Sequence, residues 1–412
     1  MSLPLPVVGR VRALGTAPTR PVPGLIVAAW AALFLNVLGW SDSTTLLPIR
    51  HLEGQIIAQA ALPTALLLAL LANRRLLVRP QLFVLLLLTM AVLSVASSLH
   101  SVYVIGSTYR AARFVGFASV LWLLTPWFGR RDLMLLRTHL AVMRGVLAVV
   151  IVGLVLSPGQ AFSFEGRLSG TLWPIPPTQV AHYSAMLLGI TVVLWLCHVI
   201  PGRTVLWTMA VAGPLLILTH TRTALLSCVV GIVLGAGSLF LGQARVRRAT
   251  AVALSVGVMV GTVFAEGLTR WLMRGQSAQQ AGQLTGRTKV WSQIAALHRD
   301  PLHEIFGNGL SNMSFNGLPI DSSWMSTYVD EGWAGITLQV LVLALLAGLA
   351  LMHQRGPRRA VALFIVTYCA VASITETGLG APSPYLLDLT VAATLLTTPL
   401  PLRTRPLGRR TP

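Results

Sequence analysis

Short clusters of basic residues alternate with long apolar runs along the whole chain. Twenty of the 31 Lys and Arg residues fall in seven such segments, and each segment lies at an end of an apolar run. Cytoplasmic loops of membrane proteins carry an excess of Lys and Arg, so this spacing predicts a chain that crosses the membrane many times. The clusters are Arg10/Arg12/Arg20, Arg74/Arg75/Arg79, Arg130/Arg131/Arg137, Arg203, Arg245/Arg247/Arg248, Arg355/Arg358/Arg359 and Arg403/Arg405/Arg409/Arg410.

The apolar runs predict twelve membrane-spanning helices. A helix needs about 20 largely apolar residues to cross the hydrocarbon core. If both termini are cytoplasmic, all seven basic clusters fall on cytoplasmic segments, which is hard to obtain with a wrong number of spans. A count of eleven or thirteen stays open if a weak span such as 113–128 is misassigned. The predicted spans are 24–40, 55–72, 81–98, 113–128, 133–156, 178–200, 204–220, 223–242, 249–266, 326–352, 359–375 and 384–400.

The composition excludes an ordinary soluble domain. Hydrophobic residues make up 54% of the chain and charged residues 10%, with a mean hydropathy of +0.73. The formal net charge of +19 would suit a nucleic-acid partner. However, the basic residues flank the apolar runs, where Lys and Arg set the orientation of membrane proteins. We therefore expect an all-α, multi-pass membrane protein, with membrane lipids as neighbours and no nucleic-acid partner.

The predicted spans divide the chain into a membrane domain and two tails. Residues 1–23 are rich in Arg and Pro, and no small-residue cleavage pattern follows the first apolar run. They are predicted to form a cytoplasmic tail before an uncleaved first span. Residues 24–400 form the membrane domain, and residues 401–412 form an Arg-rich cytoplasmic tail. All three cysteines fall inside apolar runs, so neither a disulfide nor a cysteine metal site is expected.

One long loop, residues 267–325, is predicted on the extracytoplasmic face between the ninth and tenth spans. Loops of this length in a compact protein are usually functional or disordered. Val290 and Ile294 have the spacing of one helix face, and Arg287 and Trp291, also four apart, would share another. We expect an amphipathic helix near the outer membrane surface. Its Arg and Trp could equally serve only to anchor it there.

Two further arginines lie in predicted extracytoplasmic turns. Arg167 stands beside Glu165 in the stretch 164–179, whose Gly and Pro content predicts irregular backbone. Arg222 lies in the turn LTHTRTALL (218–226), and an Arg at membrane depth usually faces a polar cavity or a partner. Arg222 taken alone could also snorkel to the outer interface. Because guanidinium groups match diphosphate oxygens bidentately, external arginines predict an anionic ligand at the outer leaflet.

The segment HRDPLHE (298–304) groups two histidines with Asp300 and Glu304, and so loosely resembles a metal cluster. A loop turn around Pro301, which we expect to end the preceding helix, explains the segment adequately. No metal site and no cofactor are therefore expected.

Four motifs occur in series between about residues 160 and 385. They are RLSGTLWPIPPTQVA, LTHTRTALL, TGRTKVW…DPLHEIFGNGLSN and DSSWMSTYVDEGWAGI. Together they resemble the O-antigen ligase and Wzy-type polysaccharide polymerase superfamily. The resemblance implies a metal-independent, inverting glycosyltransferase of the GT-C type in a bacterial inner membrane. Its donor would be a polyprenyl (undecaprenyl) diphosphate-linked glycan on the extracytoplasmic face, and its acceptor a saccharide or lipid-saccharide.

The resemblance also implies roles for individual residues. Arg222 and Arg287 match the arginines that the family uses at the donor diphosphate. Family ligases carry a His in the segment that opens the span after the loop, and Asp321 stands there in this chain. Glu376 occupies a late carboxylate position. The residues expected to contact the substrates are Arg167, Trp291, Lys289 and Glu376.

Asp321 is the predicted catalytic base. A carboxylate with an ordinary pKa of about 3.9 is ionised at neutral pH and can take the proton of an acceptor hydroxyl. Arginines fixed at the departing diphosphate would stabilise its developing charge. Asp321 could instead only cap the helix that begins after it, as Asp often does.

Three functions remain open. We favour a polymerase that extends a lipid-linked saccharide, because Asp321 replaces the ligase His. The second is a ligase that passes the finished glycan to lipid A-core, protein or wall. The third is a transporter of lipid-linked glycan; twelve spans would suit one, but transporters usually show internal repeats, and none is visible in the sequence.

Overall fold

The computed structural model describes residues 24–40, 46–47, 51–130, 132–240, 242–273 and 287–398. Both predicted tails, and residues 274–286 of the long loop, lie outside the described residues. The described chain is helical apart from one antiparallel pair of two-residue strands. These strands are β1 (Ser314–Phe315) and β2 (Leu318–Pro319).

A helix lies at each of the twelve predicted spans. Five of them, α2, α5, α7, α10 and α15, are long and apolar enough to cross a membrane, so the protein is an all-α membrane protein. The twelve helices are α1 (Gly24–Val37), α2 (His51–Ala72), α3 (Leu82–Ser98), α4 (Val104–Leu123), α5 (Met134–Leu156), α7 (Pro177–Leu196), α8 (Gly202–Leu218), α9 (Arg222–Gly237), α10 (Ala244–Val263), α15 (Ser323–Met352), α16 (Pro357–Ala372) and α17 (Pro384–Leu396).

The predicted span 113–128 differs most from the helix found at its place. Helix α4 begins at Val104 and ends at Leu123, because Arg110 and Arg113 do not interrupt it. Two charges in the first half of α4 lower the local hydropathy. For this reason the predicted span begins later in the chain than the helix does. The remaining helical segments are short: η1 (Thr125–Trp127), α6 (Pro158–Ala161), α11 (Ala265–Met273), α13 (Arg287–Ala295) and α14 (Pro301–Phe306).

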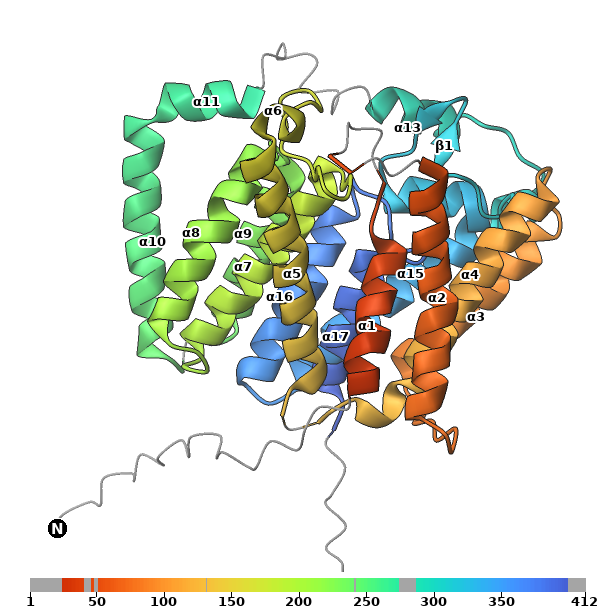
Figure 1. Cartoon of the computed structure of the whole chain (residues 1–412), viewed down its shortest axis with the longest axis horizontal. Coiled ribbons are helices and arrows are strands. Elements are labelled where there is room, and N and C mark those ends of the chain that lie inside the picture. Colours follow the sequence, from red (N-terminus) through yellow and green to blue (C-terminus); the bar gives the residue numbers. More distant parts are fainter. Residues whose placement is uncertain are drawn as a thin grey trace, which may run out of the picture.

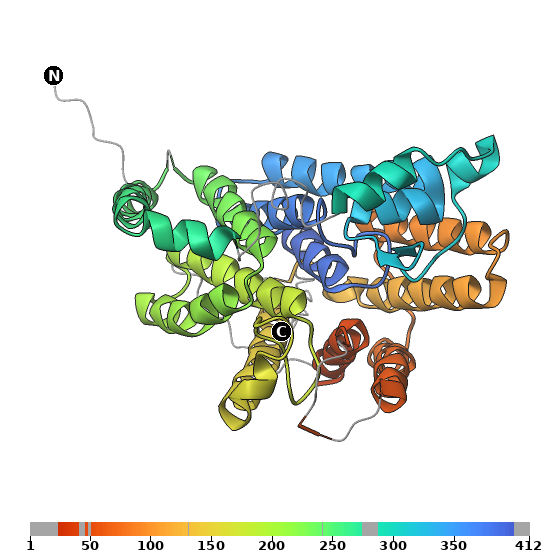
Figure 2. The same ribbon diagram turned by 90° about the horizontal axis from the view of Figure 1, so that it is seen from above.

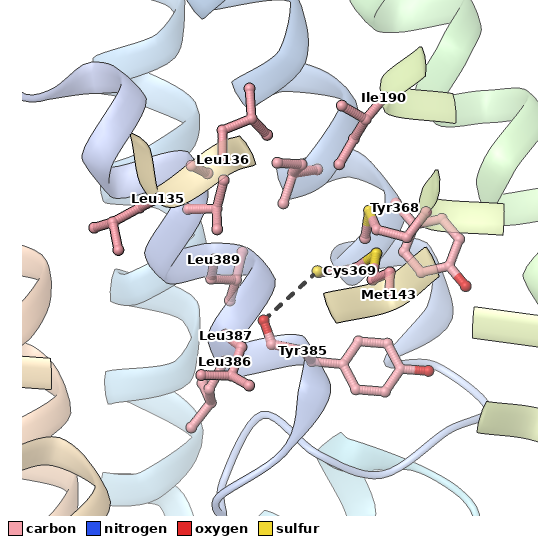
Figure 3. Packing of buried hydrophobic residues seen from close by; sticks show 14 of the residues in the cluster. Leu135, Leu136, Met143, Ile190, Tyr368, Cys369, Tyr385, Leu386, Leu387 and Leu389 are labelled. Atoms are coloured by element: carbon pink, nitrogen blue, oxygen red, sulfur yellow. Dashed lines mark hydrogen bonds between the residues drawn. The ribbon is translucent and has the colours of Figure 1, made fainter. Parts of the chain in front are cut away.

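The core lies around α7, α16 and α17, which are buried along most of their length. Figure 2 shows the two blue helices α16 and α17 in the middle of the bundle. Close packing of α9 against α16 depends on small residues, since a Cβ at Gly235 would lie 2.8 Å from the carbonyl oxygen of Ala360. Side chains of α5, α16 and α17, among them Leu136, Tyr368 and Leu389, fill the space between these helices (Figure 3).

Basic residues of five clusters lie at one end of the bundle, in loops or in the first turns of the helices that follow them. The described loops of this end, called the basic end below, are residues 73–81, 128–130, 132–133, 197–201, 238–240, 242–243 and 353–356. Hydrogen bonds join loops that are far apart in sequence: an Arg79 Nη donates to the Thr398 carbonyl (2.7 Å), and Arg358 to the Arg130 carbonyl (3.1 Å). Figure 1 shows α6, α11, α13 and β1 at the opposite end, called the site end.

Helix α15 is kinked one-third of the way along, at Gly332. Its φ of +63° is a conformation that L side chains rarely adopt, and a Cβ there would lie 2.5 Å from the Ile305 carbonyl of α14. The kink therefore lets α14 approach the backbone of α15. It also sets the first turns of α15 at the site end, next to α13.

Candidate active site

Helix α13 covers the site end with an apolar face. Val290 and Ile294 are buried against Ile320 and Val329, so this face packs on the protein itself. Trp291 is half-buried against the same cluster. The predicted helix is therefore present, with its apolar side facing α15 and the segment that precedes it.

Pro301 begins a second helix, so our expectation that it only ends the first one was wrong. Helix α13 ends at Ala295, and Pro301 is the first residue of α14. Asp300 is the N-cap of α14, because its Oδ1 accepts a hydrogen bond from the His303 amide (3.2 Å). Pro is favoured at the first helical position, where its missing N–H costs nothing.

One guanidinium group lies against two carboxylates at the start of α13. Arg287 Nε lies 3.0 Å from Asp321 Oδ2, and an Arg287 Nη lies 3.9 Å from Glu376 Oε1. The exposed fractions of the side chains are 24% for Arg287, 41% for Asp321 and 18% for Glu376. Three sequence-predicted residues from separate segments thus form one group that solvent can still reach.

Asp321 does not cap helix α15. The cap is Ser322, whose hydroxyl accepts a hydrogen bond from the Met325 amide. The alternative in which Asp321 acts only as a cap was therefore wrong, and its carboxylate is turned to Arg287 instead. The backbone amide of Ser323 donates to the carbonyl of Glu376 (3.0 Å), which fixes the Glu376 segment to the start of α15.

Arg167 is anchored on the turn that precedes α9. Its Nε donates to the Thr219 carbonyl (3.0 Å), and one Nη donates to the Thr221 hydroxyl (3.1 Å). Thr221 is the N-cap residue of α9, and Arg222 is its first helical residue. Arg167 and Arg222 thus belong to one local structure at the site end, and positive charge from both lies near a helix N-terminus, which itself favours anions.

The same turn is tied to the Glu376 segment. The hydroxyl groups of Thr223 and Thr375 lie 2.7 Å apart and share a hydrogen bond. Because Thr223 follows Arg222 and Thr375 precedes Glu376, the backbones of these two site residues are held close together. The predicted arginines and carboxylates therefore gather in one region, whereas Lys289 is exposed on α13.

Burial raises the pKa of Glu376 from 4.5 to about 7. Arg287 and Arg167 lower this pKa and Asp321 raises it, so all three groups act electrostatically on Glu376. A carboxylate whose pKa is near the working pH can both accept and release a proton. Such a shift beside a cavity is typical of functional sites.

Glu376 also lines a cavity of about 230 Å³ between the end of α1, α7 and the start of α17. The lining of the cavity also includes His182 and Tyr385, together with Pro176 and Pro384. Gln179 lines the cavity as well, but both ends of its amide are used: Oε1 accepts from the Gly39 amide (2.7 Å) and Nε2 donates to the Val37 carbonyl (2.9 Å).

The sequence did not single out His182 or the group to which it belongs. Asp388 of α17 lies between two imidazoles: His139 Nε2 is 2.7 Å from Oδ1, and His182 Nε2 is 2.8 Å from Oδ2. All three side chains are buried. Each comes from a different apolar run, and the only signal was the presence of an ionisable residue inside a membrane span.

In the part of the chain that the structure describes, no three His, Cys, Asp or Glu side chains are placed to hold a metal ion. The cationic groups expected to bind an anionic ligand are the guanidinium groups of the arginines.

Comparison with known proteins gives little more. No protein-family model matches the chain, and no curated protein matches it. A solved structure concerned with the coordination of polymerization and crosslinking by a peptidoglycan synthase complex is similar, with 17% sequence identity and a TM-score of 0.43. The match covers 76% of this chain and 96% of that chain. At this TM-score the likeness does not define a shared fold.

Proposed function

We propose that this protein is a membrane glycosyltransferase that transfers a polyprenyl diphosphate-linked glycan to a saccharide acceptor, polymerising a surface polysaccharide. One observation carries the proposal: the Arg287 guanidinium meets the carboxylates of Asp321 and Glu376 beside a cavity at the site end. Cations and proton acceptors held together in this way suit the displacement of an anionic leaving group by a hydroxyl.

In this proposal all twelve helices cross the inner membrane and both termini are cytoplasmic. The charge distribution supports that orientation, because the loops of the basic end carry Arg74, Arg75, Arg79, Arg130 and Arg355. The site end, including residues 267–325, then faces the extracytoplasmic side. A lipid-linked donor could reach it from the outer leaflet.

The chemistry is a direct displacement that inverts the anomeric centre. The acceptor hydroxyl oxygen forms a bond to the anomeric carbon while the bond from that carbon to the diphosphate oxygen breaks. The hydroxyl proton goes to a carboxylate, and the polyprenyl diphosphate leaves with the bonding electron pair. Arg287 and Arg222, with Arg167 beside them, balance the charge on the diphosphate, so no metal ion is required.

The geometry favours Glu376 over Asp321 as the base. Asp321 is paired with Arg287 at 3.0 Å and does not line the cavity. Glu376 is less exposed, its pKa is raised to about 7, and it lines the cavity. We assign Asp321 the task of orienting Arg287, and the two assignments differ in their pH dependence.

The surface glycans of a deletion strain test the function. Loss of polymer with single-repeat material retained, restored by the wild-type gene and not by Arg287→Ala, is the result expected for a polymerase. Full-length polymer that accumulates on the carrier lipid would instead identify a ligase. Accumulation of complete repeat units on the cytoplasmic leaflet would identify a transporter, and unchanged glycans would refute all three.

A further inference from the structure

The cavity beside Glu376 has the features of a site for a neutral polar ligand. Its described walls contain one carboxylate, Glu376, and no Arg or Lys, so they do not provide a site for a diphosphate. Pro176, Pro382 and Pro384 supply apolar surface, and Tyr385 supplies an aromatic ring with a polar tip. A volume of about 230 Å³ is suited to one sugar ring and not to a whole repeat unit.

His182 gives this cavity a hydrogen-bonding group with no partner of its own. The residue is 2% exposed and lines the cavity, and Asp388 lies 2.8 Å from its Nε2. Both ring nitrogens are buried and neither makes a hydrogen bond among the described residues, although Nε2 lies within ion-pair distance of Asp388. A buried polar atom left unpaired costs free energy, and a ligand hydroxyl in the cavity would remove that cost.

The position of the cavity relative to the arginines indicates which sugar it would hold. In the proposed displacement the base takes the proton of the acceptor hydroxyl, so the acceptor sugar must lie within reach of the base. Glu376 contacts Arg287 and also lines the cavity, so a hydroxyl of a sugar in the cavity would lie at the carboxylate next to the cationic group. That is the arrangement required of the acceptor.

We infer that this cavity is a subsite for one neutral monosaccharide ring of the acceptor, with His182 as a hydrogen-bonding ligand that Asp388 holds in place. Asp388 thereby acts as a positioning residue, as a carboxylate does when it fixes an imidazole from behind. The designation of the sugar as the acceptor rests on the proposed function.

His139 provides a matched control for His182. Both imidazoles contact Asp388 through Nε2, at 2.7 Å and 2.8 Å, and both carry a buried Nδ1 without a partner among the described residues. Only His182 lines the cavity. If the histidines act only through Asp388, substitution of either one should change ligand binding equally. If His182 binds the ligand, only its substitution should weaken binding.

The test is binding of methyl glycosides of common bacterial sugars, at millimolar concentration and without donor, to the purified full-length protein. Saturation-transfer NMR would give the binding signal. We expect at least one glycoside to bind wild type, His182→Gln to weaken its binding about five- to tenfold, and His139→Gln to leave it within about twofold. Thr178→Trp, at the cavity wall, should abolish the signal.

Equal weakening in the two histidine variants would overturn the inference, as would the absence of any binding to wild type. If Thr178→Trp does not fold, as judged by gel filtration, the histidine pair still decides the question. Because the assay contains no donor, its failure is distinct from failure of the proposed function. A protein that binds the sugar but never consumes a lipid-linked donor would overturn the proposed function and leave the cavity a saccharide site.

Discussion

The two ends of the helix bundle use arginine differently. At the basic end Arg79 and Arg358 donate to main-chain carbonyls, and Asp132 pairs with Arg130, two residues away in the same loop. At the site end Arg167 also donates to a main-chain carbonyl, but Arg287 meets two carboxylates that come from distant segments. The first arrangement ties loops together, and the second brings opposite charges together beside a cavity.

The difference separates arginines that shape the fold from arginines that can act on a ligand. A guanidinium that donates to main-chain carbonyl groups makes hydrogen bonds without any anion. A partly buried ion pair costs desolvation and is weak evidence for stability. The group around Arg287 includes a carboxylate of raised pKa, a combination that is common at functional sites. The predictions below test this contrast, beginning with the largest expected effect.

Arg287→Ala should reduce glycan transfer about 30- to 1,000-fold, because one charge-assisted contact to a developing diphosphate is worth on the order of 2–4 kcal/mol. Arg222→Ala should act in the same direction. Arg287→Lys should rescue poorly, since an ammonium group cannot reproduce the fork. The measurement is donor consumption by purified variants.

The matched control for this prediction is Arg358→Ala, which removes a guanidinium from the basic end. We expect its transfer rate to stay within about twofold of wild type, with a small loss of stability from the missing hydrogen bond. Similar losses of activity in both variants would erase the contrast between the two ends.

Glu376→Gln should lower the transfer rate at least about 100-fold if Glu376 is the base. In wild type the rate should rise with pH and level off above about 7, where Glu376 is ionised, and Gln should remove this dependence.

Folding raises the pKa of Glu376 from 4.5, so the contribution of Glu376 to the free energy of unfolding falls as the pH rises from 4.5 to about 7. A Gln variant with normal turnover would exclude Glu376 as base.

Asp321→Asn should lower transfer by about threefold to tenfold, because Arg287 loses one charged hydrogen-bond partner that is partly screened by solvent. The rise of the rate toward about pH 7 should persist, since Glu376 still titrates. A loss of about 100-fold together with loss of the pH dependence would return the role of base to Asp321.

Lys289→Ala should have the smallest effect, within about twofold, because an exposed charge contributes little in water. Lys289 lies on the same helix as Arg287, so the pair compares two cations of α13 that differ in their contacts. If Lys289→Ala lost as much transfer activity as Arg287→Ala, the activity would depend on positive charge on α13 and not on the ion pairs of Arg287.

The helices could be predicted because each apolar run is long and is bounded by charge or proline. Errors arose where one signal had two meanings. Arg110 and Arg113 lowered the hydropathy of α4 without ending it. Pro301 was expected to end a helix, although Pro is also the residue that commonly begins one when a capping Asp precedes it.

The sequence named Arg287, Asp321 and Glu376 but not the contacts among them. Those contacts depend on how α13, the start of α15 and the segment after α16 pack, and no local pattern encodes such packing. His182 and His139 were missed for the same reason, since each is one polar residue in a different apolar run, and Asp388 stood out only as a charge within a span. The catalytic roles of Arg287, Asp321 and Glu376 and the binding role of His182 stay predictions.

The catalytic role of the group formed by Arg287, Asp321 and Glu376 is tested most directly by turnover of a synthetic polyprenyl diphosphate-linked saccharide by the purified protein in nanodiscs. With a chelator present, wild type should form a glycosidic bond of inverted anomeric configuration and release one polyprenyl diphosphate for each bond. Arg287→Ala and Glu376→Gln should form almost none. Equal product from wild type and both variants would contradict the account.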